Sequence, residues 1–126
     1  MTDKENSLSS KIILAVDDAP FFLTMLKTIV QETPHRLICM TSGAAALRFL
    51  EANRPDLFIL DIEMPNMSGI ELAGEIRARG QTAPIIFMSG NAAEQDKAKA
   101  IEVGASEYVI KPIDKILTLE KISKYI

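Results

Sequence analysis

Short apolar runs alternate with helix-like segments along almost the whole chain. The runs predict five buried strands, at residues 11–16, 35–40, 57–60, 84–88 and 107–110. The segments between and after them predict five helices, at about residues 20–32, 44–53, 69–79, 92–103 and 115–125. A continuous apolar run of this length is typical of a parallel strand that is covered on both faces.

This alternation, with its short links, predicts right-handed crossovers and a parallel sheet with helices on both faces. The length of 126 residues fits one domain and is too short for a closed eight-stranded barrel. We therefore expect an α/β fold, a flavodoxin-like doubly wound sheet of five parallel strands in the order 2-1-3-4-5 with five helices. The domain is expected at residues 11–126, after a polar N-terminal tail at residues 1–10.

Composition excludes several classes of function. The net charge of −3 argues against direct binding of nucleic acid, whose phosphates attract basic proteins. No apolar run approaches the roughly 20 residues that span a bilayer, and the first ten residues lack a signal-peptide core, so we expect a cytoplasmic protein without membrane insertion. The single cysteine, Cys39, is expected to be a buried core thiol. The single histidine, His35, is expected at the surface rather than as a phosphodonor.

The first helix carries an apolar stripe at helical spacing. Its members, Phe22, Met25, Leu26, Ile29 and Val30, are predicted to face the core. Asp18 is predicted to cap this helix, with Pro20 in its first turn. Phe21 and Leu23 lie off the stripe, so we expect them to be exposed and to form part of a docking surface.

Charged residues stand where three of the predicted strands end. Asp17 and Asp18 follow the first strand, Asp61 follows the third and Lys111 follows the fifth. Taken alone, the adjacent aspartates fit a solvated turn and Lys111 fits an ordinary surface lysine. Because strands one and three are neighbours at the switch point of the 2-1-3-4-5 order, however, their carboxyl ends open into one crevice. The joint placement therefore predicts one site.

Three carboxylates packed together require a compensating cation, because each raises the pKa of its neighbours. Mg²⁺ is the natural candidate, since it takes hard oxygen ligands from one or two carboxylates together with phosphate oxygens. Lys111 adds a compact second positive charge that suits a carboxylate or a phosphoryl oxygen. The set predicts a magnesium-assisted phosphate site on an aspartate.

These residues resemble the receiver domains of two-component response regulators, over nearly the whole chain from Lys11 onward. The segment Asp61-Ile-Glu-Met-Pro-Asn-Met-Ser-Gly69 is similar to the family's phosphoacceptor loop, and Asp17-Asp18 and Lys111-Pro112 complete the pattern. The resemblance implies that Asp61 accepts a phosphoryl group from a sensor histidine kinase or a histidine phosphotransfer protein. It also implies Mg²⁺ bound directly by Asp18 and Asp61, through water by Asp17, and by the main-chain carbonyl of Glu63.

Further roles follow from the same resemblance. Ser89 matches the hydroxyl that bonds the incoming phosphoryl group, with Gly90 leaving room beside it, and Tyr108 matches the aromatic switch that turns inward. The Lys111-Pro112 bond resembles the family's cis bond. Glu63 and Asn91 match positions beside the path of attacking water. The expected output surface comprises residues 92–103, 107–110 and 115–125, and it would control an unknown downstream protein.

Such a protein is a signalling phosphoacceptor rather than an enzyme, although it catalyses its own aspartyl phosphorylation and dephosphorylation. Two rivals stand beside this interpretation. A phosphatase of the haloacid-dehalogenase type normally ends its first strand as Asp-x-Asp, whereas the aspartates here are adjacent and the chain is too short. A receiver-fold interaction module that acts without phosphorylation is the other, and the intact set of site residues argues against it. With no output domain of its own in 126 residues, the chain is expected to act on a separate partner, or to be an excised piece.

Overall fold

The computed structural model describes residues 10–90 and 94–126. All of the predicted N-terminal tail except Ser10 lies outside the described residues, as do Asn91 and the predicted start of the fourth helix at residue 92. Within the described part, no helix is both long and apolar enough to cross a membrane.

The sheet has the expected five parallel strands. They are β1 (Ile12–Val16), β2 (Arg36–Met40), β3 (Leu57–Leu60), β4 (Ile85–Ser89) and β5 (Glu107–Ile110). Their order is β2-β1-β3-β4-β5, and every neighbouring pair is parallel. The predicted doubly wound α/β fold of the flavodoxin-like type is therefore confirmed.

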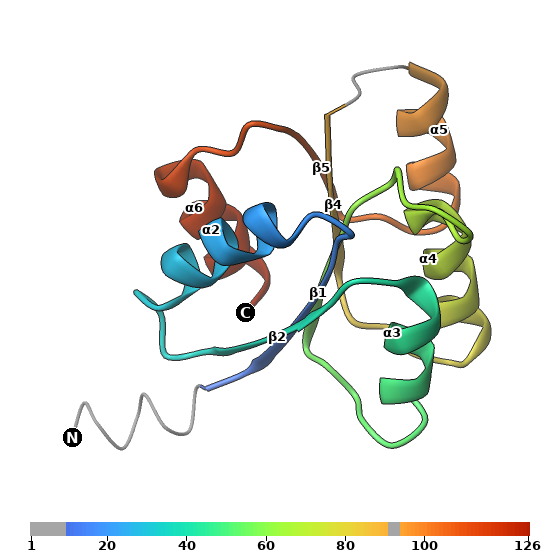
Figure 1. The fold of residues 1–126 in the computed structure, drawn as a ribbon, viewed down its shortest axis with the longest axis horizontal. Helices are drawn as coiled ribbons and strands as arrows, with labels where there is room; N and C mark the ends of the chain where they lie inside the picture. Colours follow the sequence, from blue (N-terminus) through green and yellow to red (C-terminus); the bar gives the residue numbers. More distant parts are fainter. Residues whose placement is uncertain (1–9, 91–93) are drawn as a thin grey trace.

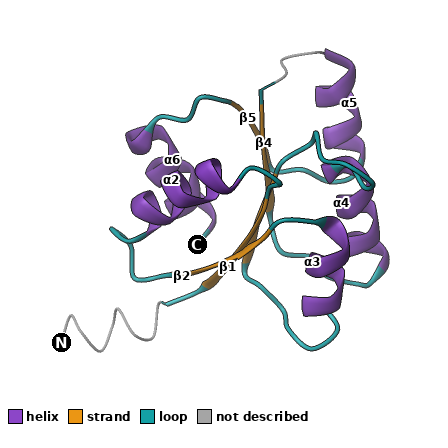
Figure 2. Ribbon diagram, viewed as in Figure 1, coloured by secondary structure: helices purple, strands orange, loops and turns teal. Residues whose placement is uncertain are grey.

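Helices cover both faces of this sheet (Figures 1 and 2). One face packs against α2 (Pro20–Val30) and α6 (Lys115–Tyr125). The other packs against α3 (Gly43–Phe49), α4 (Gly69–Ala78) and α5 (Glu94–Glu102). Both layers are apolar, which explains why the strands read as unbroken apolar runs rather than as alternating ones.

Side chains of each strand alternate between the two layers, as a pleated strand requires. Ile13 and Ala15 of β1 belong to the cluster under α2 and α6, whereas Leu14 and Val16 belong to the cluster under α3, α4 and α5. The same alternation holds in β3 and β4. The alternation also fixes the layer toward which a residue just beyond a strand end points.

Most helices begin at residues with capping side chains. Ser42, Ser68 and Asp114 accept hydrogen bonds from backbone N–H groups in the first turns of α3, α4 and α6. The prediction that Asp18 caps α2 is wrong. The cap is Ala19, which makes no side-chain cap bond, and its N–H donates instead to Asp17 Oδ1 at 2.9 Å. Pro20 opens the helix as predicted.

Several helix ends differ from the predicted ones. The helix predicted at 44–53 ends at Phe49, where the side chain of Asn53 donates to the Phe49 carbonyl and replaces a helical bond. α2 ends at Val30 rather than at residue 32. Gly80 and Gly104 follow α4 and α5 with φ of 82° and 85°, a left-handed conformation that suits glycine at a helix end.

Two burial predictions for α2 have opposite outcomes. Phe21 is exposed over 77% of its surface, as expected. The prediction that Leu23 is exposed is wrong. It is buried in the cluster with Leu26 and Ile122, because α6 lies alongside α2 and widens the buried face of α2. Cys39 is half-buried rather than a core thiol, because β2 is an edge strand.

Candidate functional site

The backbone of the sheet fixes the candidate site residues at its carboxyl edge. The N–H of Asp17 donates to the carbonyl of Met40, and the N–H of Asp61 donates to that of Val16, at 3.1 and 2.9 Å. The N–H of Lys111 donates to the carbonyl of Ser89 at 2.8 Å. Each residue thus extends the ladder by one step past its strand, so rigid elements hold its main chain.

Three of these side chains share one layer. Asp17, Asp61 and Lys111 each lie two residues beyond a strand residue of the cluster that packs under α2 and α6, namely Ala15, Ile59 and Val109. Because side chains repeat with a period of two along a strand, all three extend toward the α2 side of the edge.

The three carboxylates meet at this edge as expected. One carboxylate oxygen each from Asp17, Asp18 and Asp61 lies within 4.8 Å of the other two. Asp17 is 1% exposed and Asp61 6%, while Asp18 is exposed. Two of the three acids are therefore largely removed from water.

Lys111 joins the two buried carboxylates. Its Nζ lies 2.7 Å from Oδ2 of Asp17 and 3.5 Å from Oδ1 of Asp61. One ammonium thus faces two buried carboxylates, with the third carboxylate close by. The cluster keeps an excess of negative charge.

Burial and the neighbouring charges act together on the pKa of Asp61. Burial, reinforced by the charge of Asp17, raises the pKa of the Asp61 carboxyl from 3.8 to about 6, although Lys111 opposes the rise. The single lysine therefore compensates the cluster incompletely.

The donor set fits Mg²⁺. It offers three hard carboxylate oxygens that lie close together, one of them exposed and open to an ion that keeps part of its water shell. A divalent cation would also favour the ionised form of Asp61, which burial and the charge of Asp17 disfavour.

The loop after Asp61 folds back onto the strand end. The N–H of Gly69 donates to the carbonyl of Ile62 at 2.8 Å, and a Cβ at Gly69 would lie only 1.9 Å from the carbonyl oxygen of Asp61, so a larger residue cannot fit there. Ser68 and Glu71 then form a capping box that starts α4. Glu63 lies in this loop with an exposed side chain.

The predicted switch residues lie in the other layer. Ser89 ends β4 and is fully buried, and its hydroxyl forms a hydrogen bond with that of Tyr108. Burial raises the pKa of Tyr108, and this hydrogen bond opposes the rise. The two side chains thus contact each other directly, and Tyr108 lines a hollow with Lys97, Ala100 and Ile101 of α5. The Lys111-Pro112 peptide bond is cis, as predicted.

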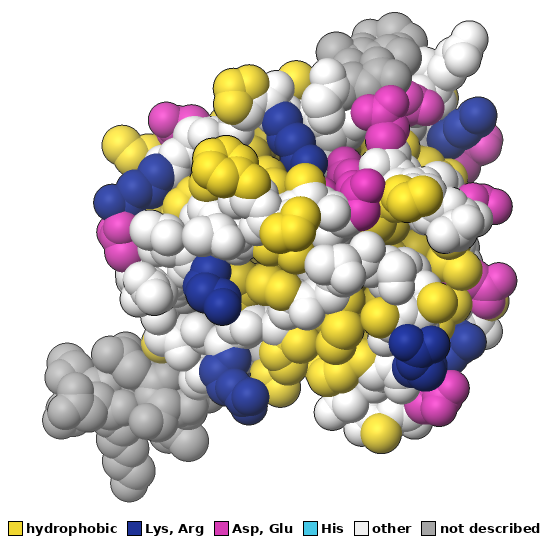
Figure 3. All heavy atoms as spheres, viewed as in Figure 1, with side chains coloured by type: hydrophobic (Ala, Val, Ile, Leu, Met, Phe, Trp, Pro, Cys, Tyr) yellow, Lys and Arg dark blue, Asp and Glu magenta, His cyan; other side chains and the backbone are white. Residues whose placement is uncertain are grey.

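An apolar hollow of about 390 Å³ adjoins the charged cluster. Phe21, Phe22 and Met25 of α2 line it together with Pro112 and Ile113. Figure 3 shows acidic and basic side chains that meet near the upper middle of this face, beside an apolar surface over α2. The site thus combines a charged crevice with an apolar rim.

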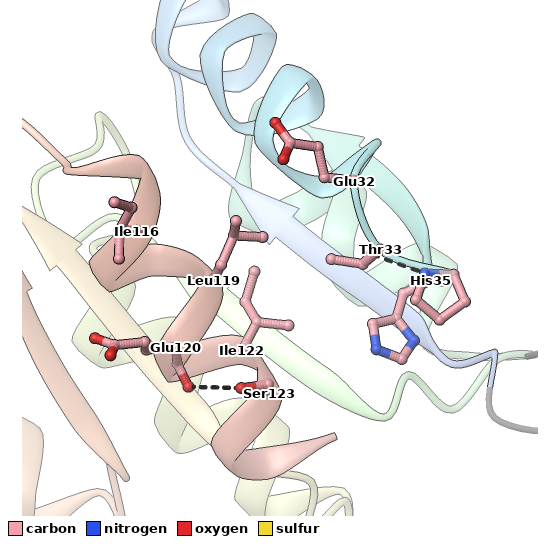
Figure 4. A pocket seen from close by; sticks show the side chains of 9 residues that line it. Glu32, Thr33, His35, Ile116, Leu119, Glu120, Ile122 and Ser123 are labelled. Carbon is pink, nitrogen blue, oxygen red and sulfur yellow. Dashed lines mark hydrogen bonds between the residues drawn. The ribbon is translucent and has the colours of Figure 1, made fainter.

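A groove of about 430 Å³ lies beyond the opposite end of α2 (Figure 4). There Leu119 and Ile122 extend from α6 toward the loop that carries Thr33 and His35. His35 is partly exposed in the lining of this groove, and its Nδ1 accepts a hydrogen bond from the N–H of Lys11. The lining is mostly apolar and, among the described residues, contains no lysine or arginine that could bind a phosphate, so we do not take this groove as the candidate site.

Two arrangements could not be found from the sequence. Lys111 Nζ lies 4.1 Å from the centroid of the Phe22 ring, whereas the sequence placed Phe22 simply in the core. At the start of β5, Glu107 pairs with Lys121, Lys124 and Tyr125 of α6. Neither pairing has a recognisable spacing along the chain.

Comparisons with known proteins agree with this geometry. The family model described as "Response regulator receiver domain" matches residues 13–123. Transcriptional regulatory protein KdpE of Mycobacterium tuberculosis is 38% identical over 101 residues, which cover 80% of this chain and 44% of KdpE. The chain thus spans less than half the length of this relative. Chemotaxis protein CheY of Listeria monocytogenes is 33% identical over 113 residues, which cover 89% of this chain and 95% of CheY.

The fold also matches solved structures. Response regulator protein TrrA of Thermotoga maritima, in complex with Mg²⁺-BeF, superposes with a TM-score of 0.82 at 36% identity. The match covers 92% of this chain and 99% of that one. A magnesium ion and a beryllium fluoride group thus accompany the same fold in a relative.

Proposed function

The chain belongs to the response regulator receiver domain family of two-component systems, and from this premise we propose that Asp61 is its phosphoacceptor. Receiver domains in such systems interact with histidine kinases and effector domains. The donor here would be the phosphohistidine of a sensor histidine kinase or of a histidine phosphotransfer protein. The observation that carries the proposal is the position of Lys111 between the buried carboxylates of Asp17 and Asp61.

The chemistry needs little beyond positioning and charge neutralisation. A carboxylate oxygen of Asp61 attacks phosphorus, the P–N bond to the donor imidazole breaks, and the imidazole leaves with a proton from water. Lys111, 3.5 Å from Asp61 Oδ1, is close enough to neutralise charge on a phosphoryl oxygen there. Burial and the charge of Asp17 raise the pKa of Asp61, so a cation beside this carboxylate would favour its ionised, nucleophilic form.

Mg²⁺ would supply that charge. We assign direct ligation to Asp18 and Asp61, ligation through water to Asp17, and a main-chain contact to the carbonyl of Glu63. The close approach of the three carboxylates supports this assignment. The exposed side chain of Glu63 leaves it free to face water near Asp61, where it would tune the lifetime of the phosphoryl group. Asn91, the other residue proposed for this role, lies outside the described residues.

Phosphorylation would act on the switch pair. The new group carries nearly two negative charges and strong acceptor oxygens, which would draw the hydroxyl of Ser89 away from Tyr108. Because these two side chains share a hydrogen bond and lie next to α5, the change would reach the surface formed by α5, β5 and α6. The shift is one of population between two packings, and it would alter binding of a downstream protein.

Acetyl phosphate with Mg²⁺ tests the phosphoacceptor directly. We expect the wild-type protein to gain one phosphoryl group by intact mass, and Asp61→Asn to gain none. Asp56→Asn is the matched control, because Asp56 lies at the opposite end of the same strand and an asparagine there can still accept the N–H of Ile12. A wild-type protein that is not modified, or an Asp61→Asn protein modified equally well, would contradict the proposal. Either result would favour an interaction module that acts without phosphorylation.

Chemical shifts test the output surface. With Mg²⁺ and beryllofluoride, which mimics the phosphoryl group, amide signals of α5, β5 and α6 should move, and they should stay in place in Asp61→Asn. If only signals beside the crevice move, the switch mechanism is wrong.

We further propose that Phe21 contributes to docking of the phosphodonor protein. Its ring is exposed beside the crevice and lines the apolar hollow, which supports a contact with an apolar partner surface. Phe21→Ser should slow transfer from a protein donor severalfold and leave transfer from acetyl phosphate unchanged. Equal slowing with both donors would refute a docking role.

A further inference from the structure

Phe22 lies on α2, on the side of the sheet toward which Lys111 extends. The ammonium of Lys111 is 4.1 Å from its ring centroid, well inside the roughly 6 Å over which a cation is attracted to an aromatic face. Phe22 is 8% exposed and the side chain of Lys111 22%, so water screens the contact poorly. Desolvated contacts of this kind are the strong ones.

The ring completes the surroundings of the ammonium. Asp17 Oδ2 lies at 2.7 Å, Asp61 Oδ1 at 3.5 Å, and the ring of Phe22 forms a further side. Lysine has a flexible four-carbon stem, and without the ring it could swing toward water or pair with Asp17 alone. The ring is itself held, because Phe22 packs in the cluster with Leu26 and Ile122.

We propose that Phe22 is a positioning residue, whose ring face holds the Lys111 ammonium within reach of Asp61 and of the phosphoryl group that arrives there. This inference rests on the proposed function and adds a requirement to it. The position must be aromatic and not merely apolar. A leucine would fill much of the same core volume but would offer the ammonium no negative ring face.

The contact can be tested without any phosphoryl transfer. The ring should shift the ε-CH₂ proton signals of Lys111 upfield, and Phe22→Leu should return them toward ordinary lysine values. Lys115, which pairs with Glu32 at the start of α6, provides the reference signal that should not move. Lys111 signals that are the same in both proteins would overturn the inference.

The function of the contact can be tested by fluorination. Replacing Phe22 with mono-, di- and trifluorophenylalanine reduces the negative electrostatic potential of the ring face in steps, while the ring stays apolar and nearly the same size. The rate of phosphorylation by acetyl phosphate should fall stepwise, by roughly fivefold at trifluorophenylalanine. The free energy of unfolding should change little. The same replacements at Phe58, a fully buried ring of the other cluster, should leave the rate unchanged.

The outcomes separate the two proposals. Equal rates across the Phe22 series, in a protein that is phosphorylated at Asp61, would overturn the positioning role alone. A wild-type protein that takes up no phosphoryl group would overturn the proposed function and the positioning role with it. A stepwise fall at Phe22 but not at Phe58 supports both.

Discussion

Two carboxylates of the same sheet have pKa values shifted in opposite directions. Burial and the charge of Asp17 raise that of Asp61 to about 6. Hydrogen bonds from Tyr125, Lys121 and Lys124 lower that of Glu107 to about 2. Asp61 shares one lysine with Asp17, whereas Glu107 receives the Tyr125 hydroxyl at 2.6 Å and two ammonium groups at 2.9 Å each.

The difference separates a carboxylate that stabilises the fold from one that is available for chemistry. Glu107 ties the start of β5 to the end of α6, and its charge is satisfied within the chain. Asp61 costs stability when it ionises, because it is buried beside Asp17 and shares Lys111 with it. Such incomplete compensation is typical of functional sites, where a ligand completes the set.

The largest expected effect concerns Lys111. If positive charge is scarce at this edge, removing the lysine that faces both buried carboxylates should be severe, so Lys111→Met should slow phosphorylation by acetyl phosphate by roughly a hundredfold. Lys115→Met removes an exposed lysine of α6 and serves as control. A loss of less than about threefold in Lys111→Met would mean that the lysine does not stabilise the transferred charge.

The next prediction concerns the cost of ionising Asp61. Its pKa is raised in the folded state, so its contribution favours folding at low pH and is lost as pH rises from about 4 to about 6. Without Mg²⁺ and above pH 6, Asp61→Asn should therefore increase the free energy of unfolding, by about 2–3 kcal/mol. The gain should vanish below about pH 4, as measured by urea unfolding across this range.

Two outcomes would contradict the claim that ionised Asp61 destabilises the fold. One is a decrease in stability for Asp61→Asn at pH 8. The other is an equal increase for Asp56→Asn, whose carboxylate caps the start of β1 instead.

Removing the charge of Glu107 should change the free energy of unfolding in the opposite direction and by a smaller amount. Its pKa is lowered in the folded state, so its contribution is present above about pH 4.5 and is lost as pH falls toward 2. Glu107→Gln should reduce the free energy of unfolding at pH 7 by about 1–2 kcal/mol. We expect no larger reduction, because Lys124 is exposed and water screens its ion pair with Glu107. Urea unfolding at pH 7 and near pH 2 measures the loss of this contribution, and a Glu107→Gln variant as stable as wild type at pH 7 would contradict the stabilising role of Glu107.

The sequence predicted those features that the apolar runs and the ends of the strands determine. Strands 57–60 and 107–110 and the helix at 115–125 have the expected bounds. Polar residues or a proline flank both strands, and Asp114 caps the start of the helix. The meeting of Asp17, Asp18 and Asp61 followed from strand order alone, since β1 and β3 are neighbours.

The features that the sequence did not predict depend on how the helices pack against the sheet and against one another. Leu23 is buried because α6 lies alongside α2, and no periodicity within α2 reveals a neighbour about 100 residues away. The contacts of Phe22 with Lys111 and of Glu107 with Tyr125 also join separate elements. Asp18 is not the cap because α2 starts one residue later, with Ala19 as the N-cap residue and Pro20 at the first helical position.

Titration of the Asp61 side-chain carboxyl carbon by NMR, with and without Mg²⁺, tests the account most directly. Without the ion, the carbon should titrate with a midpoint of about 6. With saturating Mg²⁺, the midpoint should fall below about 4, because a bound cation favours the ionised carboxylate. A midpoint near 4 without the ion, or a midpoint that Mg²⁺ leaves unchanged, would contradict the claim that this edge lacks positive charge and gains it from a divalent cation.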